Sequence, residues 1–347
     1  MRISLIAPPW VPVPPPAYGG IEMMLDILAQ GLRDAGHEVL LFATGDSTCP
    51  VPRRWVMPQA AVDRMGVRAI LAEFRHVIHA YEAVNGSDIV HDHTLIGPIY
   101  SGRFDRLPVV TTSHLPLDEE LSDLYQTTAH RVPIIAVSQT QARRAANVPI
   151  ARVIHHGIHA DDFPFGEGNG GYLLFLGRMY PEKGAKRAAA VAAKTGARLL
   201  IAAKMREPLE YAYFEEEVRP LLSDRIEFIG EVDARQKRKL LTNARALLNP
   251  IRWPEPFGLV MIEALACGTP VLSFPEGAAV EIVEHGVTGF LCHDEEDMAV
   301  RLDEIGCLDR RACRAAIEGH FSARRMIAEH LELFEQVLSG APAASWS

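Results

Sequence analysis

The sequence predicts an α/β protein that contains two doubly wound parallel-sheet domains. Short apolar runs alternate with amphipathic stretches along the chain, which is typical of parallel sheets covered by helices on both faces. A glycine-rich break at residues 166–171 divides these runs into two series. The chain has 347 residues, of which 48% are hydrophobic, and this is enough for the cores of two domains.

The apolar runs are expected to form the strands of the two sheets. In the first series, strands are expected at residues 3–7, 39–42, 89–91, 109–112 and 134–137. In the second series, they are expected at residues 172–176, 198–202, 226–229, 246–249 and 270–273. A long helix should follow the first strand, because one helical face collects Ile21, Met24, Leu25, Leu28 and Leu32.

The expected domains are an N-terminal domain over residues 1–165 and a C-terminal domain over residues 171–322. Residues 323–347 should form a last helix, which packs back toward the first domain, and a tail. Ligands of doubly wound folds bind at the carboxyl ends of the strands, so the segments after the strands are the candidate sites.

Composition excludes some classes of function. The net charge is −9, whereas a protein that follows nucleic-acid phosphates would normally be basic, so no nucleic-acid partner is expected. The five cysteines are scattered and form no CxxC pair, which suggests reduced thiols in a cytoplasmic protein. The first apolar run is short and broken by prolines, unlike a signal peptide. No run reaches the roughly 18 apolar residues of a transmembrane segment.

Two carboxylates, Glu255 and Glu263, stand on either side of an apolar run. Carboxylates are costly to bury among apolar side chains unless a partner compensates them, and hydroxyl groups of a sugar would do so. The alternative is a buried amphipathic helix in which Glu263 is incidental.

A helix is expected from Gly258 to Cys267. Two prolines disfavour helix before Phe257, and Gly268 is a suitable stop residue. The backbone N–H groups of Phe257, Gly258 and Leu259 would then leave the start of this helix as donors for an anion or a hydroxyl group.

A second candidate site follows the strand at residues 172–176. The loop there places Arg178 and Lys183 between Gly177 and Gly184, at the carboxyl end of the strand. Two cations in this position suit a diphosphate, because charge-assisted contacts are worth about 1.5–3 kcal/mol each. The alternative is solvated surface charge. The spacing matches neither a P-loop nor a GxGxxG fingerprint.

The first series of strands offers further candidates. Gly19 and Gly20 precede the first helix, where adjacent glycines allow close backbone approach and the helix start favours anionic oxygen. The alternative is a plain helix-entry turn. His91 and His93 end a strand and share one of its faces, which suits a metal. However, no third ligand can be named and the chain contains no Asp-x-Asp motif, so no metal is expected.

Three motifs together resemble the family 4 retaining glycosyltransferases, which have the GT-B architecture of two facing Rossmann-like domains. These motifs are Gly177-Arg178…Glu182-Lys183-Gly184, Glu255-Pro-Phe-Gly-Leu…Glu263-Ala…Gly268-Thr-Pro-Val and Glu281-Ile-Val…Gly286…Thr288-Gly289. The resemblance covers nearly the whole chain. It implies that residues 1–165 form the acceptor side and that residues 171–322 bind the nucleotide sugar.

The resemblance also implies roles for single residues. Positions matching Arg178 and Lys183 hold the donor diphosphate, and the position matching Glu263 binds the ribose. The position matching Glu255 contacts the transferred sugar, together with the amides of Phe257, Gly258 and Leu259. The remaining implied donor contacts are Gly230, Glu231 and Val232, in the loop that lies near the nucleotide base, and the first-domain residues Gly19 and Gly20. The implied catalytic residues are His114, Arg178, Lys183 and Glu255, of which His114 reaches the donor sugar. The implied acceptor-side residues are Trp10, Tyr18, His91 and His93.

The chain departs from the family pattern at two places. His156-Gly157-Ile158-His159 stands where the family usually has Asn-Gly-Val-Asp, and Ala278 stands where a second glycine is common. Both departures leave the diphosphate clamp intact, but they leave the sugar and the acceptor open.

The expected activity is retaining transfer of a hexose or pentose from a nucleotide-diphosphate sugar to an acceptor hydroxyl. UDP is the preferred nucleotide on family frequency, with GDP next. No metal and no cofactor besides this co-substrate is expected. The acceptor is expected to be a small molecule, a glycan or a lipid. The alanine- and arginine-rich composition suggests a high-GC bacterial source, and the chain resembles glycosyltransferases of antibiotic assembly, including the avilamycin type.

Two alternatives stay open. Another GT-B enzyme, such as a nucleotide-sugar epimerase or a phosphorylase, would use nucleotide or phosphate in the same kind of site. A non-catalytic sugar-binding protein would need no diphosphate clamp, and the cations Arg178 and Lys183 argue against it.

Overall fold

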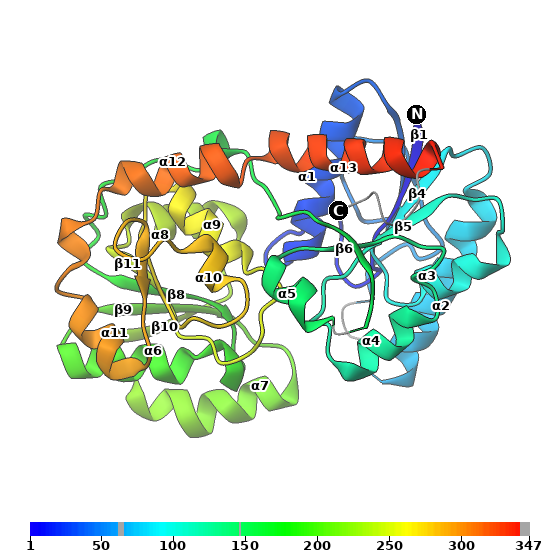
Figure 1. Ribbon diagram of the computed structural model, residues 1–347. Helices are drawn as coiled ribbons and strands as arrows, with labels where there is room; N and C mark the ends of the chain where they lie inside the picture. Colours follow the sequence, from blue (N-terminus) through cyan, green and yellow to red (C-terminus); the bar gives the residue numbers. More distant parts are fainter. Residues whose placement is uncertain (62–65, 146, 341–347) are drawn as a thin grey trace. The chain divides into compact units, whose positions relative to one another are not determined.

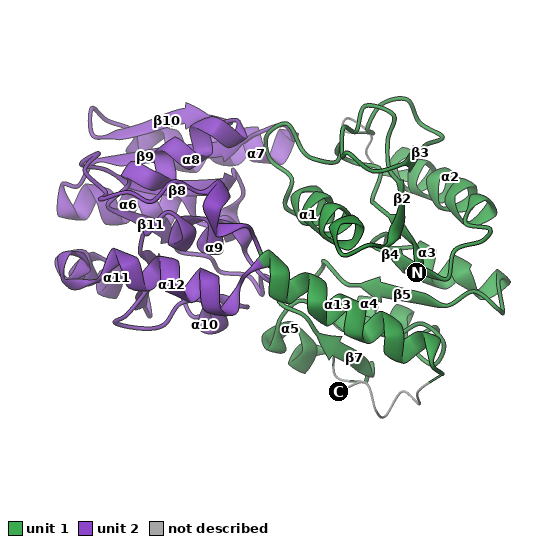
Figure 2. Ribbon diagram, turned by 90° about the horizontal axis from the view of Figure 1, so that it is seen from above, with its two compact units in different colours: residues 1–157, 323–347 green, residues 158–322 purple. Residues whose placement is uncertain are grey.

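The computed structural model describes residues 1–61, 66–145 and 147–340 (Figure 1). The chain forms two compact units, each built around its own sheet (Figure 2). Unit 1 comprises Met1–Gly157 and Ala323–Ser347, and unit 2 comprises Ile158–Ser322. Among the described residues, no helix is long and apolar enough to cross a membrane.

The described part of unit 1 contains a 7-stranded sheet with the order β3-β2-β1-β4-β5-β6-β7. Every neighbouring pair is parallel. The strands are β1 (Arg2–Ile6), β2 (Glu38–Phe42), β3 (Arg53–Arg54), β4 (Ile89–Asp92), β5 (Val109–Thr112), β6 (Ile134–Ala136) and β7 (Ile150–Val153). The five strands expected from the sequence of this part are confirmed, whereas the two edge strands β3 and β7 were not expected.

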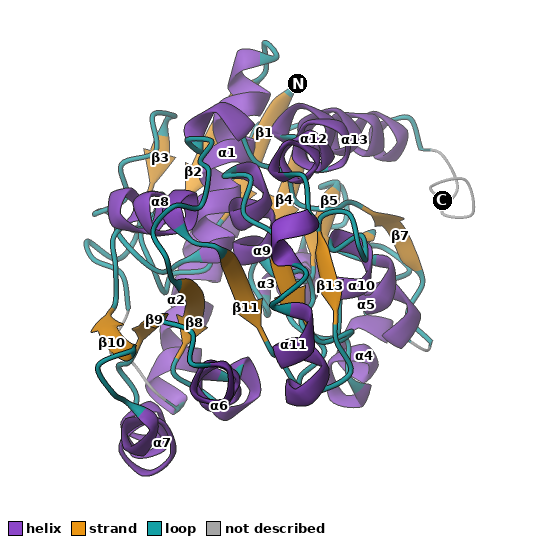
Figure 3. Ribbon diagram, turned by 90° about the vertical axis from the view of Figure 1, so that its left-hand side faces the viewer, coloured by secondary structure: helices purple, strands orange, loops and turns teal. Residues whose placement is uncertain are grey.

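Helices pack on both faces of this sheet, in two separate cores. Figure 3 draws the helices in purple and the strands in orange. The helices are α1 (Gly20–Asp34), α2 (Val67–Ala83), α3 (Gly97–Tyr100), η1 (Ser101–Arg103), α4 (Glu119–Gln126), α5 (Gln139–Arg144) and α13 (Ala323–Leu338). Successive strand residues point to opposite faces. Leu5 therefore packs in one core with α1 and α13, while Ile6 packs in another with Tyr81 of α2.

The last helix, α13, completes the core of unit 1. Met326, Leu333 and Phe334 are fully buried in the same cluster as Leu25 and Leu28 of α1. The polypeptide therefore leaves unit 1 after Gly157 and returns to it at Ala323 to cover one face of the first sheet.

The described part of unit 2 contains a 6-stranded parallel sheet with the order β10-β9-β8-β11-β12-β13. Its strands are β8 (Leu173–Arg178), β9 (Leu199–Lys204), β10 (Ile226–Gly230), β11 (Ala246–Asn249), β12 (Val271–Ser273) and β13 (Gly289–Leu291). The longer helices are α6 (Ala185–Thr195), α7 (Pro208–Tyr213), α8 (Ala234–Asn243), α9 (Leu259–Ala266), α11 (Glu295–Arg301) and α12 (Arg310–His320). The short ones are η2 (Ala160–Asp162), η3 (Pro181–Lys183), η4 (Phe214–Val218), η5 (Arg219–Leu221), α10 (Ala279–Ile282) and η6 (Ile305–Cys307).

The two sheets establish the fold class that the sequence predicts, an α/β protein with two doubly wound parallel sheets. All five strands expected in the second series are present. The edge strand β13 was not expected, because its three residues follow a turn and form no extended apolar run.

The glycine-rich segment at residues 166–171 is anchored to unit 2 and does not divide the units, although the sequence placed the domain boundary there. Gly166 N–H donates to the carbonyl of Cys267 (3.1 Å), and Gly170 N–H donates to that of Asn243 (2.9 Å). Arg310 Nε in turn donates to Gly166 O (2.6 Å). The units instead divide between Gly157 and Ile158.

Candidate functional site

In unit 2, Arg178 is the last residue of β8 and lies beside Lys204, its register partner on β9. Its guanidinium donates to two carboxylates, with Nη2 to Glu207 Oε1 at 2.7 Å and Nε to Glu210 Oε1 at 2.8 Å. Burial lowers the pKa of Lys204, and the positive charge of Arg178 lowers it further. Two cations thus stand side by side at the carboxyl edge of the sheet.

Glu210 fixes the position of the Arg178 side chain. It is fully buried, and its second oxygen accepts the backbone N–H groups of Arg206 (2.6 Å) and Glu207 (2.9 Å). Burial alone would raise the pKa of this carboxyl group, but the two amides and Arg178 outweigh it and hold the pKa below its usual value. Glu210 is therefore the fixed anion against which Arg178 is oriented.

Lys183, the last residue of η3, is a third cation of the candidate site. Its ammonium group donates to Glu255 Oε2, the same oxygen that accepts Trp253 Nε1–H at 3.1 Å. The ammonium nitrogen also lies 5.2 Å from the centre of the Trp253 ring. The loop turns at Gly184, which has φ +92, and a Cβ atom there would meet Pro250 O at 2.3 Å. Lys183 and Glu255, which the sequence assigned to different parts of a donor, are paired with each other.

The departure at Ala278 is compatible with this geometry. Its backbone N–H donates to the carbonyl of Glu255 at 3.1 Å, and its φ of −77 is accessible to any residue. The preceding Gly277 has φ +55 and lies so close to Glu255 that a Cβ atom would meet its carbonyl oxygen at 2.2 Å. Glycine is therefore required at position 277, while alanine is accommodated at position 278.

The expected helix between Gly258 and Cys267 is confirmed as α9, with these two residues as its caps. Gly258 adopts φ +91, which L side chains rarely adopt, so the loop can turn sharply into the helix. Glu263 is buried, with 2% of its surface exposed, and its carboxylate accepts from Lys237 Nζ of α8. Lys237 is a partner that the sequence analysis did not identify.

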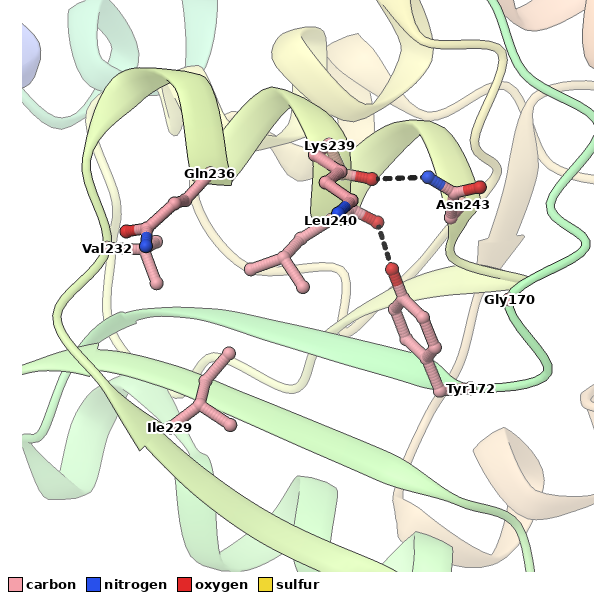
Figure 4. A pocket seen from close by; sticks show the side chains of 8 residues that line it. All are labelled: Gly170, Tyr172, Ile229, Val232, Gln236, Lys239, Leu240 and Asn243. Carbon is pink, nitrogen blue, oxygen red and sulfur yellow. Dashed lines mark hydrogen bonds between the residues drawn. The ribbon is translucent and has the colours of Figure 1, made fainter.

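The loop after β10 contains Gly230, Glu231 and Val232. Gly230 ends the strand with φ +78, and both carboxylate oxygens of Glu231 accept from Arg206 Nη2 at 2.9 Å. Val232 lines a pocket of about 490 Å³ between this loop and α8. Figure 4 shows Ile229, Val232 and Gln236 at one end of this pocket, and Tyr172 with Asn243 at the other.

At the end of the pocket with Tyr172 and Asn243, two hydrogen bonds reach backbone carbonyl groups of α8. Tyr172 O–H donates to Leu240 O at 2.9 Å, and Asn243 Nδ2 donates to Lys239 O at 2.8 Å (Figure 4). The other end, with Ile229 and Val232, adjoins the loop that the family resemblance assigns to the nucleotide base.

In unit 1, the expected glycine pair lies at the start of α1, with Gly19 as N-cap and Gly20 as the first helical residue. A Cβ atom at Gly19 would meet Pro15 Cβ at 2.6 Å, so the turn needs glycine. Trp10 packs on Met57 and Ala72, and Tyr18 is 41% exposed. Tyr18 therefore presents more of its surface than Trp10 does to any ligand of this loop.

Five histidines of unit 1 form a contiguous cluster: His91, His93, His114, His156 and His330. His93 Nδ1 and His114 Nε2 share a hydrogen bond of 2.9 Å, and the rings of His114 and His156 stack with 5.7 Å between their centres. Among the described residues, no group of three or more His, Cys, Asp or Glu side chains is arranged to hold a metal ion.

The cluster is uncharged at neutral pH. Burial lowers the pKa of His114 to about 3 and that of His330 to about 4, and it holds the pKa of His93 well below the usual value. Neutral imidazoles can donate or accept a hydrogen bond to a hydroxyl group, which suits a polyol better than an anion.

His91 does not fit its expected acceptor-side position. It is fully buried, its Nε2 shares a hydrogen bond with Thr112 Oγ1 (2.8 Å), and its ring packs against His330 and Phe334 of α13. A side chain enclosed by α13 cannot touch an acceptor, so His91 supports the ring of His93 from behind, at 3.9 Å between ring centres.

Sequence reasoning missed several residues that shape the site, among them Glu207, Glu210, Lys237, Trp253 and His330. Trp253 could have been noticed because it precedes Glu255 by one proline, and an aromatic ring beside a carboxylate suits a polar ligand with apolar faces. The others lie far along the chain from their partners and look like ordinary helix surface residues.

Two protein-family models match the chain: one begins after β1 and spans β2 to β7, and the other spans β8 to β13. The model "Glycosyltransferase Family 4" matches residues 18–162, and "Glycosyl transferases group 1" matches residues 160–311. Together with the two parallel α/β sheets, these matches define the class, and the chain belongs to the family 4 glycosyltransferases of GT-B fold.

Individual relatives agree with this class. The solved structure of AviGT4, a glycosyltransferase involved in avilamycin A biosynthesis, is 26% identical, with a TM-score of 0.74 over 98% of both chains. The phosphatidyl-myo-inositol mannosyltransferase of Mycolicibacterium smegmatis is 28% identical over 93% of this chain and 89% of its own length. The D-inositol 3-phosphate glycosyltransferase of the same organism is 27% identical over 84% of this chain and 79% of its own length.

Proposed function

We propose that this glycosyltransferase moves a sugar from a nucleotide-diphosphate donor to an acceptor hydroxyl, with retention at the anomeric carbon. The observation that carries the proposal is the pair of cations at the carboxyl end of β8. Arg178 and Lys183 each hold a carboxylate there, which is the charge that a donor phosphate would supply. Sites at this end of a parallel sheet are where doubly wound folds bind ligands.

The proposed reaction breaks the bond between the anomeric carbon and the diphosphate oxygen and forms a new bond on the same face of the sugar. The acceptor hydroxyl is the nucleophile, and its proton passes to the departing phosphate oxygen. Arg178 and Lys183 stabilise the negative charge that develops on the diphosphate. Neither step needs a metal ion, because the two side chains provide the positive charge.

Binding of a diphosphate would exchange the partner of Lys183. Its ammonium group would move from Glu255 to a phosphate oxygen, and Glu255 would become available to a sugar hydroxyl. Trp253, which donates to the same carboxylate oxygen, would keep Glu255 oriented during the exchange. Glu263, held by Lys237, would accept from the ribose hydroxyls, and His114 would contact the transferred sugar.

UDP is the preferred nucleotide, with GDP next, and the acceptor is proposed to be a small molecule or an oligosaccharide. Similarity to AviGT4 supports a role in antibiotic biosynthesis, while the name of the mannosyltransferase relative adds an inositol lipid to the acceptors worth testing. We place the reaction in the cytoplasm, where the scattered cysteines would stay reduced.

Thermal unfolding with a panel of nucleotides tests this proposal. UDP, GDP, ADP and dTDP would each be added, with the matching monophosphates as controls. The right diphosphate at one hundred times its Kd should stabilise the protein by about 2.7 kcal/mol. The monophosphate should do less, because it lacks the group held by both cations. No shift with any diphosphate, confirmed by calorimetry, would favour a non-catalytic sugar-binding protein instead.

Product analysis separates transfer from the other GT-B activities. With the preferred donor and a hydroxyl acceptor, nucleotide release that requires the acceptor indicates transfer. Isomerised donor without an acceptor would indicate an epimerase, and a sugar phosphate made from inorganic phosphate would indicate a phosphorylase. Proton NMR of the product then gives the anomeric configuration.

A further inference from the structure

His93 and His114 form a hydrogen-bonded pair of imidazoles in unit 1. His93 directly follows β4 and His114 lies two residues after β5, so both stand at the carboxyl edge of the sheet. The two ring nitrogens that meet are His93 Nδ1 and His114 Nε2, at 2.9 Å. His93 is 4% exposed, whereas His114 keeps more of its surface open. Of the two rings, His114 is therefore the one that a ligand can reach.

The position of the His93 ring is fixed by its neighbours. The backbone N–H of His93 donates to Ile6 O at 2.9 Å. The next residue, Thr94, is held by Asp92, whose Oδ1 accepts both the N–H (2.8 Å) and the hydroxyl group (2.7 Å) of Thr94. The ring of His91 lies behind that of His93, with 3.9 Å between the ring centres. The direction in which His93 Nδ1 points is therefore set by the fold.

The second nitrogen of the His93 ring has no hydrogen-bond partner in the described part of the chain. This atom, Nε2, is buried. Buried polar atoms are nearly always paired, so an unpaired one in a folded protein needs a physical reason. The two nitrogens of a neutral imidazole differ, since one carries a proton and the other a lone pair. The unpaired Nε2 therefore bears on where the proton of His93 lies.

Two proton arrangements are consistent with a hydrogen bond between these rings. Both rings are neutral, because burial lowers the pKa of His114 to about 3 and holds that of His93 well below its usual value. If His114 donated the shared proton, His93 would carry its own proton on Nε2, as a buried N–H without an acceptor. If His93 donates it, Nε2 is a bare acceptor. Orphaned buried N–H groups are rarer in proteins than orphaned acceptors, so the second arrangement is favoured.

We infer that His93 is a positioning residue, which holds His114 in the tautomer that is protonated at Nδ1. His114 accepts from His93 at Nε2, and the bond at this nitrogen sets the proton on the other. The inference rests on the proposed function, in which His114 contacts the transferred sugar. That contact becomes a hydrogen bond from His114 Nδ1–H to a sugar oxygen. His93 thus acts through His114, whereas the family resemblance implies that it faces the acceptor.

Nitrogen NMR of the wild type, labelled with nitrogen-15 histidine, tests the tautomer without any substrate. A protonated ring nitrogen and a bare one have well-separated chemical shifts, and couplings to the ring protons identify each atom. His114→Gln assigns the signals, because it removes one of the 14 histidines. At neutral pH, His114 should show a protonated Nδ1 and a bare Nε2. The reverse pattern, or an equal mixture of tautomers, would overturn the inference, and this result does not depend on whether the proposed transfer is found.

His93→Asn and His93→Leu form a matched pair of variants. Their side chains have nearly the same shape, but only asparagine has an N–H group that can replace Nδ1 as the donor to His114. His93→Asn should preserve the tautomer of His114 and keep kcat within about threefold of the wild type. His93→Leu should give a mixture of tautomers and lower kcat about tenfold, which is the effect of roughly one hydrogen bond. Equal kcat in the two variants would contradict the inference, because a merely structural role would not distinguish them.

A double-mutant cycle separates action through His114 from direct contact with an acceptor. In the His114→Gln background, His93→Leu should change kcat less than about twofold, because the ring on which His93 acts is absent. A tenfold loss in both backgrounds would show that His93 contacts the acceptor itself, and the inference would then be wrong. His130→Gln, at an exposed histidine, is the control and should match the wild type in kcat and in the NMR signals of His114.

Discussion

At the scale of single residues, Arg178 and Lys183 are held in different ways. Arg178 is fixed by Glu210, which is fully buried and also accepts two backbone amides. Lys183 is paired with Glu255, and both of these side chains keep about a fifth of their surface exposed. The lysine can therefore change partner at low cost, whereas the arginine is a permanent part of the structure.

This difference predicts separable effects of two substitutions. Lys183→Ala should lower kcat about 10²- to 10³-fold, because it removes a group that stabilises the charge developing in the transition state. The free energy of unfolding should stay nearly unchanged. Arg178→Ala should lower turnover as strongly and also cost about 1–3 kcal/mol of stability, because the buried Glu210 loses its cation. Steady-state kinetics and urea denaturation measure the two effects.

Lys186→Ala is the matched control, since this lysine lies three residues further along the chain, in α6, and pairs with the exposed Glu217. It should be close to the wild type in both measurements. Near-normal turnover in both Arg178→Ala and Lys183→Ala would remove these residues from the reaction.

The identity of the cationic residues could be read from the sequence, but their pairing could not. Arg178 and Lys183 follow an apolar run and a glycine, which are local signals. The contact between Lys183 and Glu255 joins positions that are 72 residues apart, and only the order of β8 and β11 in the sheet brings them together. His91 was misplaced for the same reason, since the helix that encloses it comes from the other end of the chain.

At the scale of elements, α9 was the helix best defined by its sequence. Prolines before it and Gly268 after it are local signals, and both ends lie within one residue of the expected positions. Strands β3 and β7 were missed because β3 has two arginines only and β7 includes Arg152, so neither forms an apolar run. Both segments are strands because they pair with a neighbouring strand, β3 with β2 and β7 with β6. The residues of the two segments themselves do not indicate this pairing.

The start of α9 predicts the effect of Gly258→Ala. The alanine would have to adopt φ +91, and its Cβ would lie 2.6 Å from Met261 Cε. A left-handed conformation alone costs about 1–2 kcal/mol, so the free energy of unfolding should fall by at least this amount. Donor affinity should fall as well, because the amides at the helix start would move.

Gly319→Ala provides the control in chemical denaturation. Gly319 lies inside α12 and needs no positive φ, and a Cβ atom added there would meet no other atom within 4 Å. Alanine at this position should stabilise the protein by up to about 1 kcal/mol. Equal stability of the two variants would mean that the turn at Gly258 tolerates a side chain.

The histidine cluster, which joins β4, β5 and α13, predicts a loss of stability in acid. The pKa of His330 is about 4 in the folded state and 6.5 when unperturbed, so the unfolded chain takes up the proton first. The stability it contributes is complete above pH 6.5 and is lost as the pH falls toward 4. Asp92 acts in the opposite direction, because burial raises its pKa to about 6.

His330→Phe tests this linkage. Replacing one such histidine should reduce the loss of unfolding free energy between about pH 7 and pH 5 by about 1–2 kcal/mol. Urea denaturation at the two pH values gives the difference, and His320→Phe, at an exposed position on α12, should not change it. An unchanged pH dependence in His330→Phe would show that folding does not lower the pKa of this ring.

At the scale of the whole molecule, the division of the chain predicts which fragment of unit 2 is stable. Residues 158–322 should fold alone with a cooperative transition. Residues 171–322 begin at the last residue of the glycine-rich segment. They lack the carbonyl groups of Phe163, Pro164 and Gly166, which accept from Arg314, Thr242 and Arg310. This shorter fragment should melt about 5 °C lower or more. Equal melting temperatures by circular dichroism would show that the segment is a linker after all.

The sequence located two sheets but misplaced the point where the chain passes from one unit to the other. Glycine-rich composition is the same in a linker and in a set of tight turns, and only hydrogen bonds to Cys267 and Asn243 distinguish them. The chain passes from unit 1 to unit 2 between Gly157 and Ile158, and the amino-acid composition does not change at this point.

The return of α13 to unit 1 means that unit 2 is, in topological terms, an insertion within unit 1. The two ends of the insertion are neighbours, because Ile158 pairs with Ser322 and its N–H donates to Phe321 O at 2.9 Å. On the unit 1 side, Arg325 Nη2 donates to His155 O at 2.6 Å. Excising residues 158–322 and joining Gly157 to Ala323 by a short glycine linker would therefore restore unit 1 as one uninterrupted chain.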